Sequence, residues 1–248
     1  MGVVVPEGLI AHGRGEAFDY FLGERTTPSA RRAIHAAAQW MVHARRPVLS
    51  VNGNVAALAA DRVARLSRAL PRLGVEVNLF HRTPARARRI GAILRRAGVR
   101  RVLGLRPNAR IPGLPSDRAF VDREGIFVAD VCVVPLEDGD RTEALRAMGK
   151  RVISIDLNPL SRTSVSADLP IVDELRRALQ ALAEEVARPP RRGSKRFATV
   201  DRKALLAAAR RTMARSLTRG PTGRVRAAVG RRSTRSASSP RVPGRRRR

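Results

Sequence analysis

Short apolar runs alternate with amphipathic segments along most of this chain. Four of the runs are apolar on both faces, and each stops abruptly at small polar and charged residues. They cover residues 48–51, 75–77, 131–136 and 152–155. Such runs are typical of strands buried in a parallel sheet, whose carboxyl ends open onto the crevice where open α/β folds bind ligands. We therefore predict that the polar clusters after these runs meet in one site.

The amphipathic segments have the spacing of helices, and short loops join them to the apolar runs. Helices are predicted over 29–44, 55–70, 84–97, 140–149 and 173–186, and strands over 48–51, 75–80, 102–105, 126–136, 151–155 and 169–172. Residues 106–125 contain too much Pro and Gly for a helix, and we interpret them as a functional loop. With right-handed crossovers, the alternation predicts an α/β Rossmann-like three-layer sandwich with a mostly parallel sheet.

Basic residues gather towards the end of the chain. The net charge is +29, and residues 188–248 hold 21 Lys and Arg against one Asp, whereas residues 1–187 hold 29 against 20 acidic residues. We therefore expect a Rossmann-like domain over 1–187, a basic linker over 188–219 with a helix near 205–213, and a disordered Arg-rich tail over 220–248. A segment of this kind would bind nucleic acid without sequence preference.

The composition disfavours several classes of function. No apolar stretch is long enough to cross a bilayer, and no basic segment precedes a long apolar one near Met1, so we expect a cytoplasmic protein with no membrane partner. The single cysteine, Cys132, lies inside an apolar run, where a free thiol behaves as a small hydrophobic side chain. We therefore expect neither a metal cluster nor thiol catalysis.

A block near the start of the chain, residues 8–20, combines His12, Arg14, Glu16 and Asp19 with glycines. Glycines let backbone amides approach a phosphate closely, and a guanidinium supplies paired donors. The block fits a phosphate-binding loop ahead of a helical turn, and equally a solvated loop with a capping carboxylate. It is not a dinucleotide fingerprint, because the glycine spacing is wrong and no strand precedes it.

Two strand ends carry more polar groups than helix capping requires. After the run at 48–51, one of Asn52 and Asn54 is accounted for as a helix cap, and the second amide is better explained as a ligand group. After the run at 131–136, Asp140 suits an N-cap, but Glu137 and Asp138 remain. Crowded carboxylates repel unless a metal cation, a bound amine or an arginine compensates them, which indicates Mg²⁺ or an ammonium substrate.

The segment 156–163 repeats this form. Asp156 follows a strand and can accept hydrogen bonds from ribose hydroxyls, and Arg162 follows in a loop made rigid by Pro159. In a doubly wound sheet this pattern is typical of a nucleotide site. The alternative is a polar loop with an ordinary surface arginine.

Five blocks of the sequence together resemble one family closely. They are GLIAHGRGEAFDY at 8–20, SVNGNVAAL at 50–58, RIPGL at 110–114, VVPLEDGDRTEAL at 133–145 and IDLNPLSR at 155–162. In this order they are similar to the archaeal phosphopantothenate synthetases, also called 4-phosphopantoate–β-alanine ligases, over about residues 8–187. The resemblance implies an ATP-dependent ligase of coenzyme A biosynthesis, and from the crowded carboxylates we expect Mg²⁺ to accompany ATP. Such a ligase would join 4-phosphopantoate to β-alanine through an acyl-adenylate and release AMP and diphosphate, as a homodimer.

The resemblance also implies site residues. Positions matching the family's nucleotide contacts are Arg14, Asp156, Leu157, Asn158, Arg162, Thr163, Glu174 and Leu175. We expect Arg14 at the ATP phosphates and Asp156 at the ribose. The anionic pantoyl substrate is expected to bind near Asn52, Asn54, Arg82 and Arg110. His12 and Asp138 are expected to hold the β-alanine ammonium or to transfer a proton, and Arg110 is grouped with them as a catalytic candidate.

Two features depart from the family pattern. Members usually carry a further N-terminal helical segment with another ATP-contacting arginine, whereas the block at 8–20 lies close to Met1 here. Position 174 is Glu where the family has an amide, and a carboxylate there is expected to weaken nucleotide binding through repulsion. Two other functions stay open at this point: non-specific nucleic-acid binding through the basic tail, and nucleotide binding without catalysis.

Overall fold

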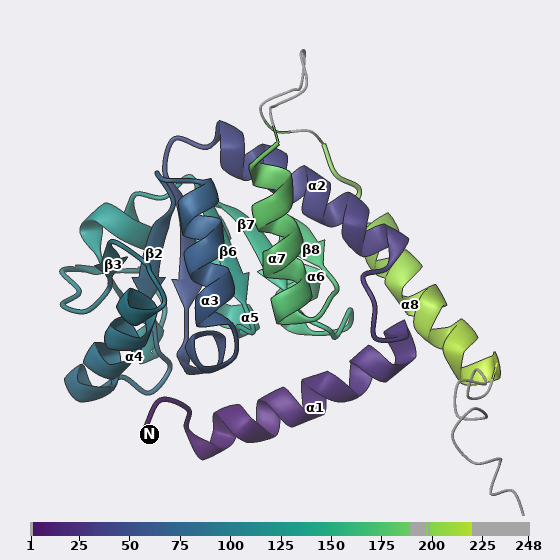
Figure 1. Cartoon of the computed structure of the whole chain (residues 1–248), viewed down its shortest axis with the longest axis horizontal. Helices are drawn as coiled ribbons and strands as arrows, with labels where there is room; N and C mark the ends of the chain where they lie inside the picture. The colour runs from purple at the N-terminus through teal and green to yellow at the C-terminus, as the bar shows by residue number, and fades with distance from the viewer. Residues whose placement is uncertain (1, 189–196, 198, 220–248) are drawn as a thin grey trace, which may run out of the picture.

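A parallel six-stranded sheet, in the order β3-β2-β1-β6-β7-β8, forms the centre of the molecule (Figure 1). The computed structural model describes residues 2–188, 197 and 199–219, so the tail predicted over 220–248 lies outside the described residues. The strands are β1 (Pro47–Val51), β2 (Gly74–Val77), β3 (Val102–Leu103), β6 (Val131–Pro135), β7 (Arg151–Ile155) and β8 (Leu169–Ile171). The predicted α/β fold with a mostly parallel sheet is confirmed.

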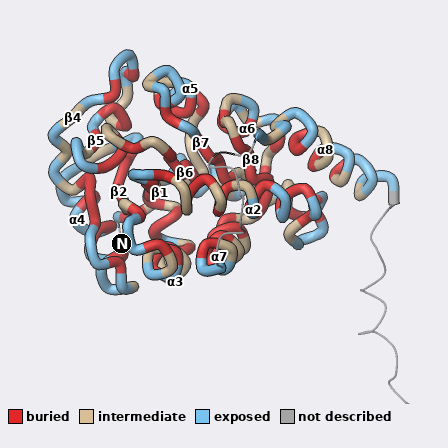
Figure 2. The backbone as a smooth tube through the Cα atoms, turned by 90° about the horizontal axis from the view of Figure 1, so that it is seen from above, coloured by how far each residue is buried: buried red, intermediate tan, exposed pale blue. Residues whose placement is uncertain are grey.

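Helices cover both faces of the sheet (Figures 1 and 2). One face carries α2 (Pro28–His43), α3 (Gly53–Ala69), α4 (Pro84–Arg96) and α7 (Leu175–Val186). The other carries α5 (Gly139–Ala147), α6 (Arg162–Ser166) and the segment 104–127, which contains β4 (Ala109–Arg110), η1 (Asp117–Ala119), β5 (Phe120–Val121) and η2 (Arg123–Phe127). The sheet is therefore the middle of three layers, as the alternation of elements predicts.

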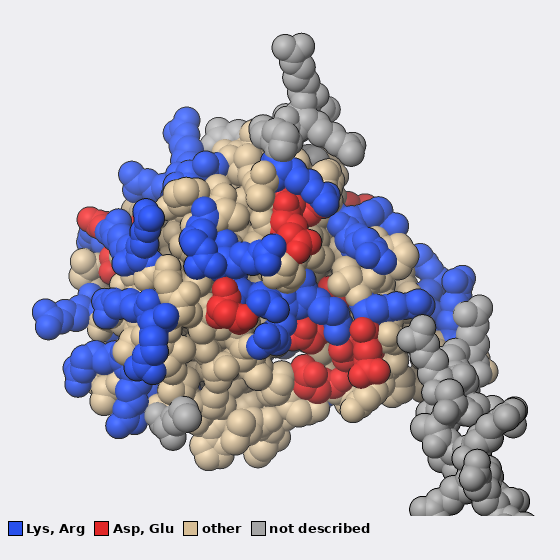
Figure 3. Space-filling view, in the orientation of Figure 1, with Lys and Arg blue, Asp and Glu red and all other residues tan. Residues whose placement is uncertain are grey.

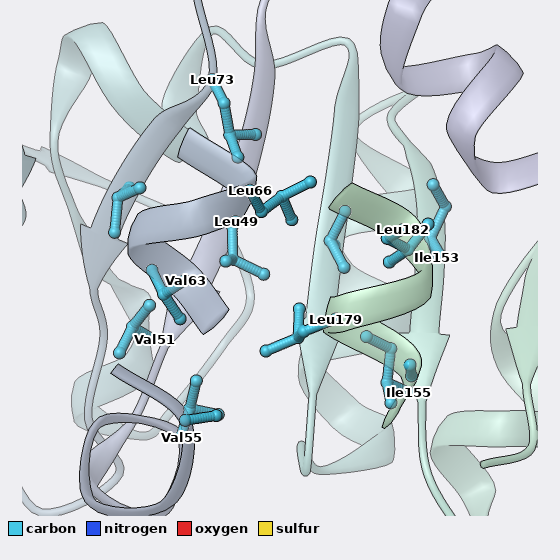
Figure 4. Close-up of a cluster of buried hydrophobic side chains, with 14 of the residues drawn as sticks. Leu49, Val51, Val55, Val63, Leu66, Leu73, Ile153, Ile155, Leu179 and Leu182 are labelled. Atoms are coloured by element: carbon cyan, nitrogen blue, oxygen red, sulfur yellow. The ribbon is translucent and has the colours of Figure 1, made fainter. Parts of the chain in front are cut away.

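Alternate strand residues feed two hydrophobic cores, as expected for strands buried on both faces. Figure 4 shows the larger core, in which Leu49 and Ile153 of the sheet pack against Leu66 of α3 and Leu179 of α7. All four side chains are almost completely buried, and burial of one such side chain is worth about 1.5–3 kcal/mol. This packing fixes the helices, and with them the turns that connect strand ends to helix starts.

Two further helices, α1 (Pro6–Leu22) and α8 (Arg202–Arg219), pack against each other, and α8 also contacts α2 and β8. The helix predicted near 205–213 is thus present and longer. Leu206 and Met213 of α8 share a small apolar cluster with Leu22 of α1 and with Leu157 and Val172. Helix α8 therefore takes part in the packing beside the end of β7.

Two predicted elements were wrong. Residues 8–20 form part of α1, and Gly13 and Gly15 lie in helix turns with open space beside them, where each glycine costs the helix only about 1 kcal/mol. The strand predicted over 126–136 begins only at Val131. Residues 123–127 instead form the short helical turn η2, because the amide of Ile126 donates to the buried Glu76 carboxylate and not to a neighbouring strand.

Charged side chains cover much of the face shown in Figure 3, where Lys and Arg outnumber Asp and Glu. Helix α4 alone has five arginines and no acidic residue, although its buried side still packs on the sheet. Within the described part of the chain, none of the helices combines the length and the apolar character that crossing a bilayer requires.

Candidate active site

A pocket of about 600 Å³ opens at the carboxyl edge of the sheet, where β1 and β6 are neighbours. The strand order reverses here, because β2 and β3 lie on one side of this pair and β7 and β8 on the other. Open α/β sheets bind ligands at such a switch point, and the volume lies in the range of small-molecule sites. The walls are α1, the start of α3 and the turns after β6 and β7.

Most of the residues predicted from the sequence meet in this pocket. Its lining includes His12, Arg14, Asn54, Asp138, Asp156, Leu157, Asn158, Arg162 and Thr163. The predicted convergence of strand ends is therefore present for β1, β6 and β7, and Arg14 reaches the same place from α1. The remaining candidates, Asn52, Arg82, Arg110, Glu174 and Leu175, do not line it.

Helix α1 crosses the start of α3 closely to form one wall. The Nδ2 of Asn54 donates to the carbonyl of Gly8 at 2.9 Å, and a Cβ on Gly8 would lie 3.1 Å from the Oδ1 of Asn54. On the same wall, the Nε2 of His12 lies 3.7 Å from the Oε1 of Glu16, one helical turn away. Burial raises the pKa of Glu16, and His12 acts against that rise. The wall thus presents an imidazole and a carboxyl side by side.

Arg14 is the basic residue of this wall. It forms no hydrogen bond or ion pair with any residue that the structure describes, although it lines the pocket. Burial raises the pKa of Asp156, and the positive charge of Arg14 opposes that rise across the pocket. A guanidinium whose N–H groups donate to no protein acceptor can bind an anion through paired donors.

Asn52 ties the ends of β1 and β6 together. Its Oδ1 accepts from the amide of Val55 at 3.0 Å and so caps α3, while its Nδ2 donates to the carbonyls of Pro135 at 3.2 Å and Leu136 at 2.9 Å. Leu136 has a φ of +50°, a left-handed conformation that a bulky residue rarely adopts. Asn52 therefore shapes the turn, and Asn54 is the amide that faces the pocket.

Arginines neutralise Glu137, which follows β6. Its side chain is 1% exposed, its Oε1 lies 2.6 Å from a terminal nitrogen of Arg118, and its Oε2 pairs with Arg141. Arg141 is fully buried and also donates to the hydroxyl of Ser50 at 3.0 Å. Burial raises the pKa of Glu137, and the two guanidinium groups act against the rise. Arginine, one of the compensating groups considered from the sequence, neutralises this carboxylate.

Asp138 is the carboxylate of this turn that reaches the pocket. Its Oδ1 accepts from the amide of Arg141 at 3.0 Å, so Asp138, and not Asp140 as predicted, is the N-cap of α5. Its Oδ2 lies 2.7 Å from the Nε of Arg118, and its side chain remains 30% exposed. No cluster of three or more His, Cys, Asp or Glu suited to a metal ion occurs among the described residues. Asp138 is therefore oriented by Arg118 and still open to a cationic group.

The loop after β7 folds around Asp156. Its Oδ1 accepts from the amide of Asn158 at 2.9 Å and its Oδ2 from the hydroxyl of Ser161 at 2.7 Å. Arg162 pairs with Asp140 at the surface, which joins the starts of α5 and α6. Because a carboxylate offers about four acceptor positions, Asp156 retains capacity for hydroxyl groups of a ligand.

The candidates outside the pocket have clear structural contacts. Arg82 donates to the carbonyls of residues 104 and 105 at 2.8 and 3.1 Å, and the guanidinium of Arg110 lies 5.1 Å above the ring of Phe120. Glu174 accepts from two amides in the first turn of α7, at 2.7 and 2.9 Å, and is its N-cap. Leu175 is 3% exposed and belongs to the core.

Sequence reasoning missed Arg118 and Arg141, the two arginines that hold the acidic turn. Arg118 comes from η1, inside the irregular segment 104–127, where no local motif distinguishes it from other arginines. The available signal was indirect, because a carboxylate directly after an apolar strand requires a compensating cation. The sequence indicated that need without identifying the partner.

The fold and the site define a Rossmann-like α/β protein with a charged ligand pocket at its topological switch point. A family model described as phosphopantothenate/pantothenate synthetase matches residues 29–216, and the chain belongs to this family. The match extends through most of α8, past the five blocks that carried the resemblance.

Curated relatives support the same assignment. A protein of Thermococcus onnurineus is 54% identical over 184 residues, which cover 74% of this chain and 70% of the relative. Proteins of Thermococcus kodakarensis (52%) and Methanosarcina mazei (53%) match over the same length, covering 74% of this chain and 70% and 72% of the relatives. All three are named 4-phosphopantoate–β-alanine ligase. The resemblance inferred from the sequence is confirmed.

Proposed function

We propose that the protein is an ATP-dependent ligase that joins 4-phosphopantoate to β-alanine, forming 4′-phosphopantothenate in coenzyme A biosynthesis. The observation that carries this proposal is one pocket that combines the unpaired Arg14 with Asp138 and Asp156, in a chain whose relatives bear that name. A phosphorylated acid and a nucleotide need cationic donors and a ribose acceptor, and an amino acid needs a carboxylate for its ammonium. The pocket offers each of these.

The proposed reaction has two steps. A carboxylate oxygen of 4-phosphopantoate attacks the α-phosphorus of ATP, the bond to the β-phosphate breaks, and diphosphate leaves. The β-alanine amine then attacks the acyl carbon of the adenylate, loses a proton and displaces AMP. Catalysis of this kind depends mainly on positioning and on neutralising charge.

Nucleotide binding is assigned to α1 and to the loop after β7. Arg14 contacts the ATP phosphates in this proposal, because it lines the pocket and forms no hydrogen bond or ion pair with a described residue. Asp156 accepts from the ribose hydroxyls, held in place by Asn158 and Ser161. Leu157, Arg162 and Thr163 complete the proposed nucleotide contacts.

The acyl acceptor and the phosphorylated acid are assigned to the opposite part of the pocket. Asp138 holds the β-alanine ammonium, because its side chain is partly exposed and fixed by Arg118. His12 is placed to take the proton from the amine, with Glu16 beside it. Asn54 faces 4-phosphopantoate, whereas Asn52, Arg82 and Arg110 support the surrounding turns.

ATP binds as its Mg²⁺ complex in this proposal, and the residues present fit an ion that is coordinated mainly by the phosphates. Mg²⁺ commonly binds through one or two carboxylates plus substrate phosphates and keeps several waters. Because Asp138 is assigned to the substrate ammonium, the phosphates and water would supply most of the ligands of the ion here. The bound ion would neutralise charge on the phosphates.

The test uses the full chain with ATP, 4-phosphopantoate and β-alanine, and follows AMP by chromatography. AMP formation that requires all three compounds is expected. AMP formation without β-alanine at the same turnover, or none under any condition, would contradict the ligase. We also propose a homodimer, for which light scattering should give about twice the 27.1 kDa chain mass; a single-chain mass would contradict it.

A further inference from the structure

Glu76, in the middle of β2, is a buried carboxylate that the proposed reaction does not use. Its side chain is fully buried, and its oxygens accept from the amides of Asp122 at 2.8 Å and Ile126 at 2.6 Å. A buried charge is costly unless it is paired or fully hydrogen-bonded. These two bonds explain how the carboxylate is tolerated, and they join β2 to the segment 104–127.

The segment 104–127 is folded tightly around this carboxylate. A Cβ on Gly125 would overlap the Oε2 of Glu76, and a Cβ on Gly104, whose φ is +75°, would lie 2.7 Å from the Cγ of Glu76. Two residues further along β2, the Nδ2 of Asn78 donates to the carbonyls of Arg118 and Phe120, both at 3.1 Å. Glu76 and Asn78 thus hold this segment against the sheet through four hydrogen bonds.

The same segment delivers Arg118 to the pocket. Arg118 is 7% exposed, and its guanidinium lies 2.6 Å from Glu137 and 2.7 Å from Asp138. Glu137 and Asp138 both line the pocket, and of the two only Asp138 has an appreciably exposed side chain. Any movement of the segment would therefore reorient the carboxylate assigned to the β-alanine ammonium.

We propose that Glu76 is a positioning residue, whose carboxylate anchors the segment 104–127 so that Arg118 holds Asp138 in its working orientation. The assignment of Asp138 to the substrate amine rests on the proposed ligase function. The anchoring itself rests on the contacts of Glu76 alone. Loss of the anchor should therefore affect kcat and the KM for β-alanine, and leave the KM for ATP nearly unchanged, because Arg14 and Asp156 lie on other elements.

The anchor is sensitive to pH. Burial raises the pKa of Glu76 to about 7, and the hydrogen bonds from the segment act against the rise. Five charged or titratable groups interact electrostatically with Glu76. They are Arg82 after β2, Asp122 of the segment, Arg141 of α5, Cys132 of β6 and Lys150 before β7. A protonated carboxyl has a hydrogen on one oxygen and cannot accept equally from both amides. These two hydrogen bonds should therefore weaken locally as the pH falls through about 7, although protonation relieves the cost of burying the charge and favours the folded chain over the unfolded one.

Glu76→Gln tests the proposal against Glu124→Gln, a matched change on the same segment at an exposed side chain paired with Arg101. AMP formation is measured from pH 5.5 to 8.5 with each substrate varied. Glu76→Gln should lower kcat by about ten- to a hundredfold, raise the KM for β-alanine, and change the KM for ATP by less than about twofold. It should also remove the part of the acidic limb that titrates near pH 7. Glu124→Gln should behave as wild type.

Gly125→Ala gives a second perturbation from the segment side, since the added methyl displaces the carboxylate without removing its charge. It should shift the kinetics in the same direction, and it carries the test if Glu76→Gln does not fold. Hydrogen exchange of peptides covering 117–127 gives a readout that needs no activity. Faster exchange in Glu76→Gln and Gly125→Ala, and not in Glu124→Gln, is expected.

The outcomes separate the two proposals. A wild-type protein that forms no AMP contradicts the ligase, while the exchange data still decide the anchor. Glu76→Gln with wild-type kcat, an unchanged acidic limb and unchanged exchange would overturn the role of Glu76. An equal loss in Glu124→Gln would also overturn it, because the effect would then not depend on the buried carboxylate.

Discussion

Replacing Arg141 with methionine is expected to destabilise the protein by about 3 kcal/mol. Arg141 is fully buried and Glu137 is 1% exposed, so their charges have almost no access to water. Methionine keeps a similar length and removes the charge. Glu137 would then depend on Arg118 alone, which lies 2.6 Å from its other oxygen.

The magnitude follows from this burial. Breaking a buried ion pair by removing one partner typically costs about 3–5 kcal/mol, because it leaves an uncompensated charge. Arg118 still compensates Glu137, which places Arg141→Met near the lower limit. Glu137→Gln leaves Arg141 with the hydroxyl of Ser50, so it should cost about 4 kcal/mol. The double variant contains no unpaired charge and should lose no more than the less stable single variant, about 4 kcal/mol. The coupling energy should therefore be at least about 3 kcal/mol.

Urea unfolding followed by fluorescence provides the assay, since Trp40 is the single tryptophan and is buried in the core. Wild type, both single variants and the double variant are compared at one pH, with the slope of each transition checked for two-state behaviour. Single effects that add in the double variant, or an Arg141→Met loss below about 0.5 kcal/mol, would refute the reasoning.

Four further changes test other parts of the structure. Arg14→Ala should raise the KM for ATP about ten- to a hundredfold, as expected for a lost charge-assisted bond to phosphate; an unchanged KM would remove Arg14 from the nucleotide site. Leu206→Ala should lower the free energy of unfolding by about 2–4 kcal/mol, because this side chain is buried against Leu22, and a neutral result would show that α8 is not part of the cooperative fold. The pKa of Glu76 is raised from 4.5 to about 7, so its contribution to stability is fully present below pH 4.5 and is lost as the pH rises through 7. The free energy of unfolding of wild type, relative to that of Glu76→Gln, should therefore fall between these pH values. A difference that stays constant in urea titrations would contradict the raised pKa. A chain ending at Arg219 should keep AMP formation and lose most non-specific nucleic-acid binding at low salt, whereas retained binding would place that property outside the tail.

The convergence of strand ends was predictable because it follows from local pattern and one topological rule. Runs that are apolar on both faces identified β1, β6 and β7, and parallel strands place their carboxyl ends at one edge. Asn54, Asp138 and Asp156 each come directly after one of these strands or within its turn, so their meeting required no knowledge of distant contacts. Pro28 and Pro47 likewise marked the limits of α2 in the sequence.

The remaining features depend on tertiary contacts that local pattern does not contain. Gly13 and Gly15 suggested a loop, although an exposed helix tolerates them and α1 is held by its packing on α8 and α3. Ile126 lies in an apolar run typical of a strand, yet Glu76 binds its amide. Arg118 reaches the pocket only because the segment 104–127 is folded onto β2. Each case was decided by a partner far away in the sequence.

A crystal structure of the protein with ATP and 4-phosphopantoate tests the central claim most directly. We predict that the triphosphate lies against Arg14 and the ribose against Asp156, with the carboxylate of the acid near the α-phosphorus. Asp138 should lie close enough to that carboxylate to hold the β-alanine amine that attacks it. Nucleotide bound away from these residues, for example in the smaller pocket beside Trp40 and Arg151, would contradict the account.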